Sequence, residues 1–178
     1  MTRPVWLLDF DGVINIIGWG GTAVRRAWGD TRSSDALGYK LTVSDRLTRE
    51  IKHLHESGLV EVRWLTTWED YANEHLIKEL DWPELAVAGR SAESIMIERR
   101  FTGDVGWWKL EFAQEIYNSG ARVIWTDDDI TSSSDARSWL KTCDPERMNW
   151  TCPHSGLMPD DFAMIKRVIK RWNDQPAT

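Results

Sequence analysis

The sequence predicts an α/β domain, with a mainly parallel sheet in a Rossmann-like arrangement of three layers, α/β/α. Two observations support this prediction. Short apolar runs alternate along the chain with segments of helical spacing. Three of the runs end at polar residues that can carry chemistry, namely Asp9, Thr66 and Asp127. A parallel sheet binds its ligands at the carboxyl ends of its strands, which is where these residues would lie. The chain of 178 residues is near the size of one domain, so we expect residues 1–172 to form a single domain and 173–178 a flexible tail.

Each expected element has its own signal. The apolar run 5–8, bounded by Pro4 and Asp9, is typical of a buried strand. The segment 44–57 is expected to be a helix, because Ser44 can cap its start, Gly58 can end it, and apolar residues between them recur at helical spacing. The other expected strands are 59–65, 85–88, 122–126 and 148–151, and the other expected helices are 69–80, 107–119, 134–141 and 160–172.

The segment 14–39 is rich in glycine, arginine and serine and has no clean period. We interpret it as an irregular loop or a small hairpin flap. Neither this segment nor the interval between Thr66 and Lys109 is long enough for a second, covering domain. An open site with at most a small flap is therefore expected.

Composition and charge limit the class of protein. The net charge of −6 argues against broad, non-specific binding of nucleic acid. The apolar runs are too short to cross a bilayer, and the start of the chain lacks a secretory signal, so we expect no membrane association and a cytoplasmic location. The spacing of Cys143 and Cys152 matches no zinc or redox motif, so free thiols are expected. The twelve tryptophans are expected to serve mainly in packing.

The strongest motif is Asp9-Phe10-Asp11-Gly12, directly after the first strand. Two carboxylates separated by one residue can both reach a site at the end of that strand, and Gly12 permits backbone angles that other residues avoid. The alternative interpretation is a capped turn, in which aspartate and glycine are common anyway.

Three further segments carry candidate groups. Thr66 and Thr67 follow the second strand, where a hydroxyl can donate to a phosphoryl oxygen, or can instead cap the next helix. Asp127-Asp128-Asp129 follows a later apolar strand and can hold a hard cation, or can form a solvated acidic loop. Lys109 is either an exposed lysine or a cationic partner for these carboxylates.

In this order, these motifs resemble the four motifs of the haloacid dehalogenase superfamily, and the chain is most similar to its compact phosphatase-like domains associated with nucleic-acid repair. The resemblance covers roughly residues 5–130 and predicts the fold of that family without its full cap domain. It implies that Asp9 is the nucleophile and Asp11 the general acid and base. It also implies that Thr66 and Lys109 bind the transferring phosphoryl group.

The resemblance further implies a Mg²⁺ cofactor bound by Asp9, by the backbone carbonyl of Asp11 and by Asp127, with Asp128 as the alternative or additional ligand. The register within the acidic run stays open at this point. A carboxylate attacking an anionic phosphate needs its charge compensated, which Mg²⁺ and Lys109 can supply. The sequence thus predicts a Mg²⁺-dependent phosphatase that acts through an aspartyl-phosphate.

An open site would admit a bulky phosphorylated substrate, such as a DNA or RNA end, or a nucleotide. Arg25 and Arg26, in the expected flap, and Thr67 are candidate substrate-binding residues, and Arg32 is a further basic residue of the flap. Two basic pairs on the last helix form either a strip for a phosphate backbone or a solvated helix face. These pairs are Lys166, Arg167, Lys170 and Arg171.

Three alternatives remain open at this point. The chain could be a non-catalytic module that keeps the fold and binds a metal or a partner. It could also be a phosphatase of small metabolites. A phospho-receiver domain uses similar groups, but places its acidic pair and its phosphorylated aspartate on different strands.

Overall fold

The computed structural model describes residues 3–91 and 107–175. Its central feature is a five-stranded sheet of order β5-β4-β1-β6-β7, in which every neighbouring pair is parallel. The strands are β1 Val5–Leu8, β4 Glu61–Trp64, β5 Ala86–Val87, β6 Val123–Thr126 and β7 Met148–Thr151. The parallel sheet predicted from the sequence is confirmed, and β1 occupies its centre.

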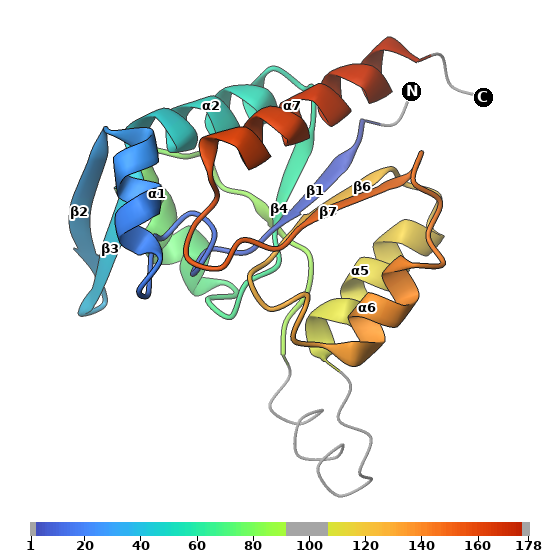
Figure 1. Ribbon diagram of the computed structural model, residues 1–178, viewed down its shortest axis with the longest axis horizontal. Coiled ribbons are helices and arrows are strands. Elements are labelled where there is room, and N and C mark those ends of the chain that lie inside the picture. The colour runs from blue at the N-terminus through green and yellow to red at the C-terminus, as the bar shows by residue number, and fades with distance from the viewer. Residues whose placement is uncertain (1–2, 92–106, 176–178) are drawn as a thin grey trace, which may run out of the picture.

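Helices cover both faces of this sheet (Figure 1). α2 (Asp45–Glu56) and α7 (Pro159–Asp174) lie over one face, and α5 (Trp108–Asn118) and α6 (Ser134–Leu140) over the other. The side chains of β1 alternate between the two hydrophobic cores: Trp6 and Leu8 belong to one, and Val5 and Leu7 to the other. The result is the three-layer α/β/α arrangement.

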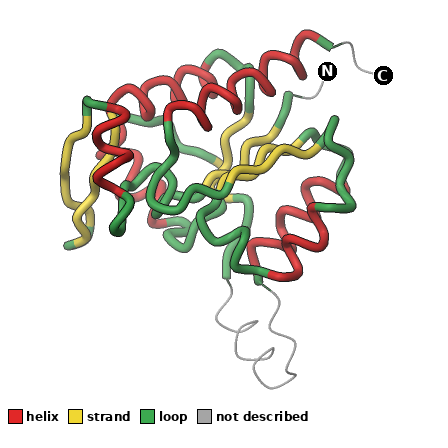
Figure 2. The backbone as a smooth tube through the Cα atoms, viewed as in Figure 1, coloured by secondary structure: helices red, strands yellow, loops and turns green. Residues whose placement is uncertain are grey.

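The segment 14–39 contains more regular structure than expected. It holds a helix, α1 (Gly21–Trp28), and most of a hairpin formed by β2 (Thr31–Ala36) and β3 (Tyr39–Ser44). The tube in Figure 2 shows this hairpin as a pair of strands separate from the main sheet. The hairpin interpretation is therefore confirmed, but the helix is absent from the sequence prediction. Its buried side chains are only Val24 and Trp28, which is too short a pattern to indicate a helix.

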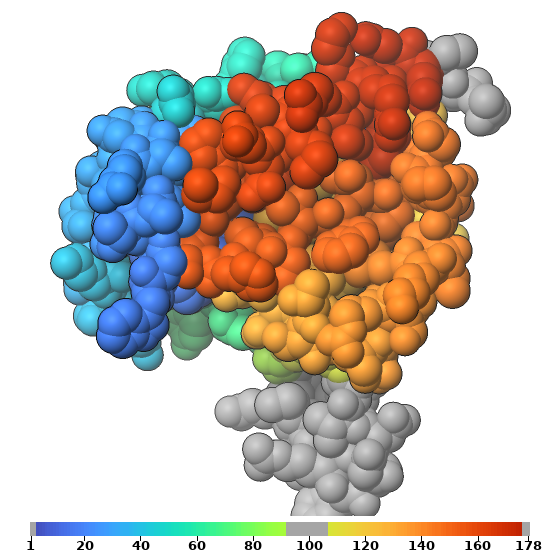
Figure 3. All heavy atoms as spheres, in the orientation of Figure 1, coloured from blue at the N-terminus to red at the C-terminus, as the bar shows by residue number. Residues whose placement is uncertain are grey.

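This N-terminal unit is joined to the main domain by specific contacts. The indole Nε1 of Trp28 donates to the carbonyl of Leu157, just before α7, at 2.8 Å. Ile17 donates from its backbone to the carbonyl of Ser155. Figure 3 shows the N-terminal region and the start of α7 in contact over the visible face. The hairpin and α1 are therefore packed parts of the domain.

Two other elements differ in detail from the expected ones. The helix expected at 69–80 begins only after a turn, as a π-helical segment, η1 (Ala72–Leu76), which continues into α3 (Ile77–Leu80). Glu69 lies outside it, with φ of 48°. The last helix reaches Asp174, beyond its expected end at Trp172, and Asn173 donates to the carbonyl of Leu59. Among the described residues, no helix has the length and apolar character needed to cross a membrane.

Candidate active site

The topology brings the chemical groups of three strands to one edge of the sheet. β1 lies between β4 and β6, with Leu8 paired to Trp64 on one side and to Thr126 on the other. Asp9 and Asp127 come directly after these pairs, and Thr66 comes two residues after Trp64. All three are buried. The predicted convergence at the carboxyl ends of the strands is therefore present in the structure.

Lys109 links two of these strand ends. Its Nζ lies 2.7 Å from Oδ2 of Asp9 and 2.7 Å from Oδ2 of Asp127. The three residues are 4%, 5% and 0% exposed, so this ion-paired group is almost wholly removed from water. Burial opposes the charge of Lys109, but the two carboxylates outweigh burial and raise its pKa. The lysine is therefore held as a cation between the two aspartates.

The placement of Lys109 depends on the start of α5. It is the second residue of that helix, and the rings of Trp107 and Trp108 lie 5.9 and 6.0 Å from its Nζ. Trp107 in turn stacks on Trp125 of β6, with ring centroids 5.2 Å apart. These aromatic contacts hold the lysine against the sheet edge and favour its charged form.

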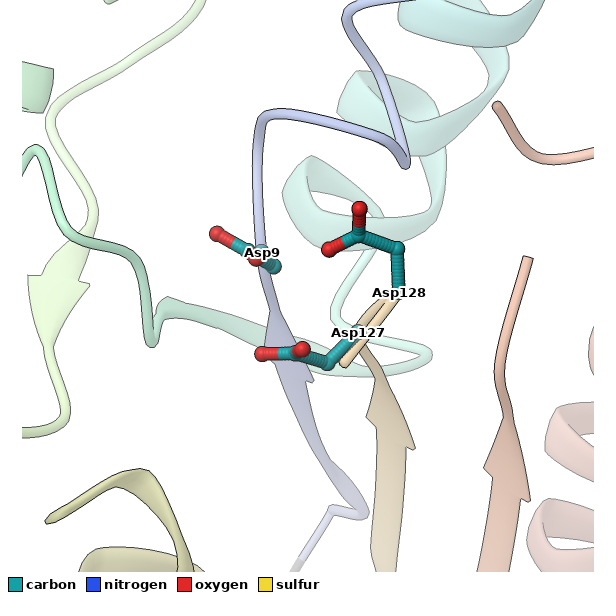
Figure 4. A group of neighbouring side chains, drawn as sticks. All are labelled: Asp9, Asp127 and Asp128. Atoms are coloured by element: carbon teal, nitrogen blue, oxygen red, sulfur yellow. The ribbon is translucent and has the colours of Figure 1, made fainter. Parts of the chain in front are cut away.

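Asp128 joins Asp9 and Asp127 in a carboxylate cluster (Figure 4). One oxygen from each of the three lies within 4.8 Å of the others. Burial raises the pKa of Asp127 to about 7, and the charge of Asp9 adds to the rise while Lys109 opposes it. Burial also raises the pKa of Asp128 to about 6, with further contributions from Asp9 and Asp129.

This cluster suits a hard divalent cation. Its three carboxylates face a single ammonium group, so negative charge remains uncompensated, and oxygen is the ligand that Mg²⁺ prefers. Among the described residues, the members of the acidic run lie differently with respect to the cluster. Asp129 is exposed and contributes its backbone N–H to Oδ1 of Asp127, whereas Asp127 and Asp128 contribute carboxylates to the cluster.

Gly12 is required at its position by two features of the turn. Its φ is 71°, in the left-handed region. A Cβ atom there would lie 2.1 Å from Oδ2 of Asp128. The glycine of the first motif therefore lets the loop after β1 approach the loop after β6, and so brings Asp128 into the cluster.

The carboxylate of Asp11 points to two other side chains. Its Oδ1 accepts a hydrogen bond from Nδ2 of Asn15 at 2.7 Å, and its Oδ2 accepts one from the indole Nε1 of Trp68 at 2.8 Å. Asp11 is half-buried, beside the cluster rather than within it. Asn15 and Trp68 were not among the residues predicted from the sequence. The only feature of the sequence that could have indicated them is position along the chain: Asn15 lies close to the first motif, and Trp68 lies close to Thr66.

The other candidate site residues predicted from the sequence differ in whether they reach the carboxylate cluster. Thr66 is buried at the end of β4, where its hydroxyl accepts a hydrogen bond from the backbone of Trp68 at 3.4 Å. Thr67 is exposed on the same turn. Arg25 and Arg26 are exposed on α1, and Arg25 donates to Thr22 of that helix. The structure thus brings Thr66 to the site edge but does not connect either arginine to the carboxylates.

Arg32 does not reach over the site. Its guanidinium donates to Asp45, at the start of α2, at 2.6 Å and to the backbone carbonyl of Glu79. These contacts fasten the hairpin to α2 and α3. Arg32, a basic residue of the expected flap, therefore uses these donors to hold the fold together.

The last basic pair of α7, Lys170 and Arg171, lies at the opposite end of the sheet from the candidate site. The last turns of α7 are fixed beside the amino ends of the strands, because Arg122, just before β6, donates to the carbonyl of Trp172. The candidate site is at the opposite, carboxyl ends. Most of the basic side chains are also paired with carboxylates: Lys166 with Glu50, Lys170 with Asp174 and Arg171 with Glu146. The interpretation as a solvated helix face is favoured.

Both cysteines are free, as expected.

Comparison with known proteins gives no match: no family model, no curated protein and no solved structure is similar to this chain at a significant level. The fold and the geometry of the site are therefore the basis for its functional interpretation.

Proposed function

We propose that the protein is a Mg²⁺-dependent phosphatase of the haloacid dehalogenase type, with Asp9 as its nucleophile. The observation that supports this most strongly is the bridge from Lys109 to Asp9 and Asp127, within a cluster completed by Asp128. A carboxylate, a lysine and a hard-cation site at one sheet edge are the components that phosphoryl transfer to an aspartate needs.

In this proposal an oxygen of Asp9 attacks the phosphorus of a phosphate monoester, and the bond from phosphorus to the leaving oxygen breaks. Asp11 donates a proton to that oxygen, which leaves as an alcohol. Asp11 then takes a proton from a water molecule, whose oxygen attacks the phosphorus. The bond between phosphorus and Asp9 breaks, and inorganic phosphate is released.

Lys109 and Thr66 bind the transferring group. The Nζ of Lys109 lies where it can compensate the charge of the nucleophile and of a phosphoryl oxygen at once. Thr66 follows β4, next to the strand that carries Asp9, so its hydroxyl is available at the same edge. Asp9, Asp127 and Asp128 would hold Mg²⁺, with the backbone carbonyl of Asp11 as a further ligand. When bound, Mg²⁺ supplies charge compensation between the carboxylates and the phosphate.

As substrates we propose phosphorylated nucleic-acid ends or nucleotides. Among the described residues, the expected flap region between β1 and α2 consists of α1 and the β2–β3 hairpin. These elements are too small to form a separate covering domain. Arg25 and Arg26 are exposed on this unit and free of carboxylate partners among the described residues, so they are candidates for contacts with a second phosphate.

A phosphatase screen tests the proposal. The substrates are 3′- and 5′-phosphorylated oligonucleotides, nucleoside monophosphates and sugar phosphates, each with Mg²⁺ and with EDTA. We expect Mg²⁺-dependent release of phosphate from the first two classes, and its loss in Asp9→Asn, which keeps the side-chain shape but removes the nucleophilic charge. Turnover confined to sugar phosphates would instead identify a small-metabolite phosphatase. Absence of any turnover, together with Mg²⁺ binding, would identify a binding module.

A further inference from the structure

The carboxylate of Asp11 is held by two neutral donors that come from different loops. Asn15 belongs to the loop after β1 and donates to Oδ1, while Trp68 belongs to the turn after β4 and donates to Oδ2. Both contacts are short, at 2.7 and 2.8 Å. Each carboxylate oxygen carries two lone pairs, so either oxygen can still hold a proton while it accepts its N–H. The two donors thus fix the orientation of the carboxyl group without blocking proton transfer.

Both donors are themselves fixed by β3. The Oδ1 atom of Asn15 accepts a hydrogen bond from the backbone N–H of Thr42 at 2.8 Å. The ring of Tyr39, at the other end of β3, meets the ring of Trp68 edge-on, with centroids 5.7 Å apart at 73°. The hairpin therefore supports the amide on one side of Asp11 and the indole on the other.

The indole of Trp68 has little freedom to turn. Phe10 also meets it edge-on, with centroids 6.0 Å apart at 82°, so the ring is held between Phe10 and Tyr39. The backbone N–H of Trp68 points to Thr66. With its plane and its backbone both held, the indole N–H is aimed at Asp11 before any substrate binds. Preorganisation of this kind is what a general acid needs to act within a small range of geometry.

We propose that Trp68 and Asn15 are positioning residues for proton transfer by Asp11, and that the β2–β3 hairpin serves to hold them in place. This inference rests on the proposed function, because it assumes that Asp11 protonates a leaving oxygen. It assigns a role to Trp68, Asn15 and Tyr39, and it gives the β2–β3 hairpin a function beside the candidate site.

The dependence of the rate on the leaving group tests this inference. Protonation by Asp11 matters for an alkoxide that leaves poorly and matters little for a nitrophenolate that leaves well. The variant is Trp68→Phe, which keeps an aromatic ring between Phe10 and Tyr39 but lacks the N–H. The control is Trp19→Phe, the same exchange at a fully exposed side chain of 104% relative exposure. Benzyl phosphate and p-nitrophenyl phosphate, both carrying one aromatic ring, are the two substrates.

We expect kcat/KM of Trp68→Phe to fall about 10-fold or more with benzyl phosphate, and less than about 3-fold with p-nitrophenyl phosphate, since general acid catalysis contributes about 100-fold or more in total. kcat/KM reports the steps up to formation of the aspartyl-phosphate, so the later hydrolysis does not mask the difference. Trp19→Phe should match the wild type with both substrates.

An equal loss with both substrates, or no loss with either, would overturn the positioning role and leave the phosphatase proposal standing. A wild type without Mg²⁺-dependent turnover would overturn both. A second measurement does not depend on the folding of Trp68→Phe. In ¹H–¹⁵N spectra of Asp11→Ala, one indole N–H resonance should move strongly upfield relative to the wild type, because Trp68 loses its acceptor. Unchanged indole resonances would also overturn the proposal.

Discussion

Replacing Lys109 by methionine should destabilise the metal-free protein strongly. Methionine has nearly the same length and volume, so the change removes the charge and leaves the packing in place. The ammonium group lies 2.7 Å from Asp9 and 2.7 Å from Asp127, inside a site that is almost wholly buried. Removing one partner of a buried ion pair costs about 3–5 kcal/mol of the free energy of unfolding, because the remaining charge stays buried without compensation.

The assay is urea unfolding followed by tryptophan fluorescence at pH 8, with EDTA present. The matched control is Lys170→Met, which removes the partner of Asp174 in a pair whose side chains are 77% and 65% exposed. That exchange should change the free energy of unfolding by no more than about 1 kcal/mol. A loss for Lys109→Met that is equally small would refute the reasoning, because the lysine would then not be compensating buried carboxylates.

The remaining predictions concern the carboxylate cluster. Mg²⁺ at a hundredfold excess over its Kd should raise the Tm by about 5–10 °C at pH 8, as followed by differential scanning fluorimetry. This rise should shrink at pH 5, because protons compete with the metal at Asp127 and Asp128, whose pKa values are raised to about 7 and about 6. In the metal-free protein, folded Asp127 keeps a proton that the unfolded chain loses above the ordinary pKa of 3.8. The free energy of unfolding of the metal-free protein should therefore fall as the pH rises towards about 7. A Mg²⁺ effect that is independent of pH would contradict this. Gly12→Ala should abolish the Mg²⁺-dependent rise in Tm, because the added Cβ would lie 2.1 Å from Oδ2 of Asp128. Gly38→Ala is the control: its φ of 79° gives the same backbone strain, of about 1–2 kcal/mol, but nothing lies within 4 Å of the added Cβ. Equal Mg²⁺ responses in the two variants would contradict the role of Gly12.

Much of the sheet edge was predictable from the sequence, because parallel strands bring the residues after their carboxyl ends together. Asp9, Thr66 and Asp127 meet for this reason, and the order of the motifs was enough to predict it. Lys109 was predictable only in combination with the acidic residues. Nothing in its own segment indicates that the lysine is 4% exposed rather than solvated.

Other features depend on contacts that no local pattern records. The acidic run left the choice among its members open. In the structure Asp127 and Asp128 place carboxylate oxygens in the cluster, while a backbone turn directs the N–H of Asp129 to Asp127. Trp68 looked like one more packing tryptophan, since only the folded chain places its N–H on Asp11. α1 was missed because two buried residues do not define a helical period.

Covalent trapping of phosphate tests the central proposal most directly. Wild-type protein is mixed with Mg²⁺ and a substrate identified in the screen, quenched in acid during turnover, digested and analysed by mass spectrometry. We predict that the peptide containing Asp9 carries a phosphate, that Asp9→Asn carries none, and that EDTA prevents the labelling of the wild type. Mg²⁺-dependent turnover with phosphate on another residue, or labelling that persists in Asp9→Asn, would contradict the assignment of Asp9 as the nucleophile.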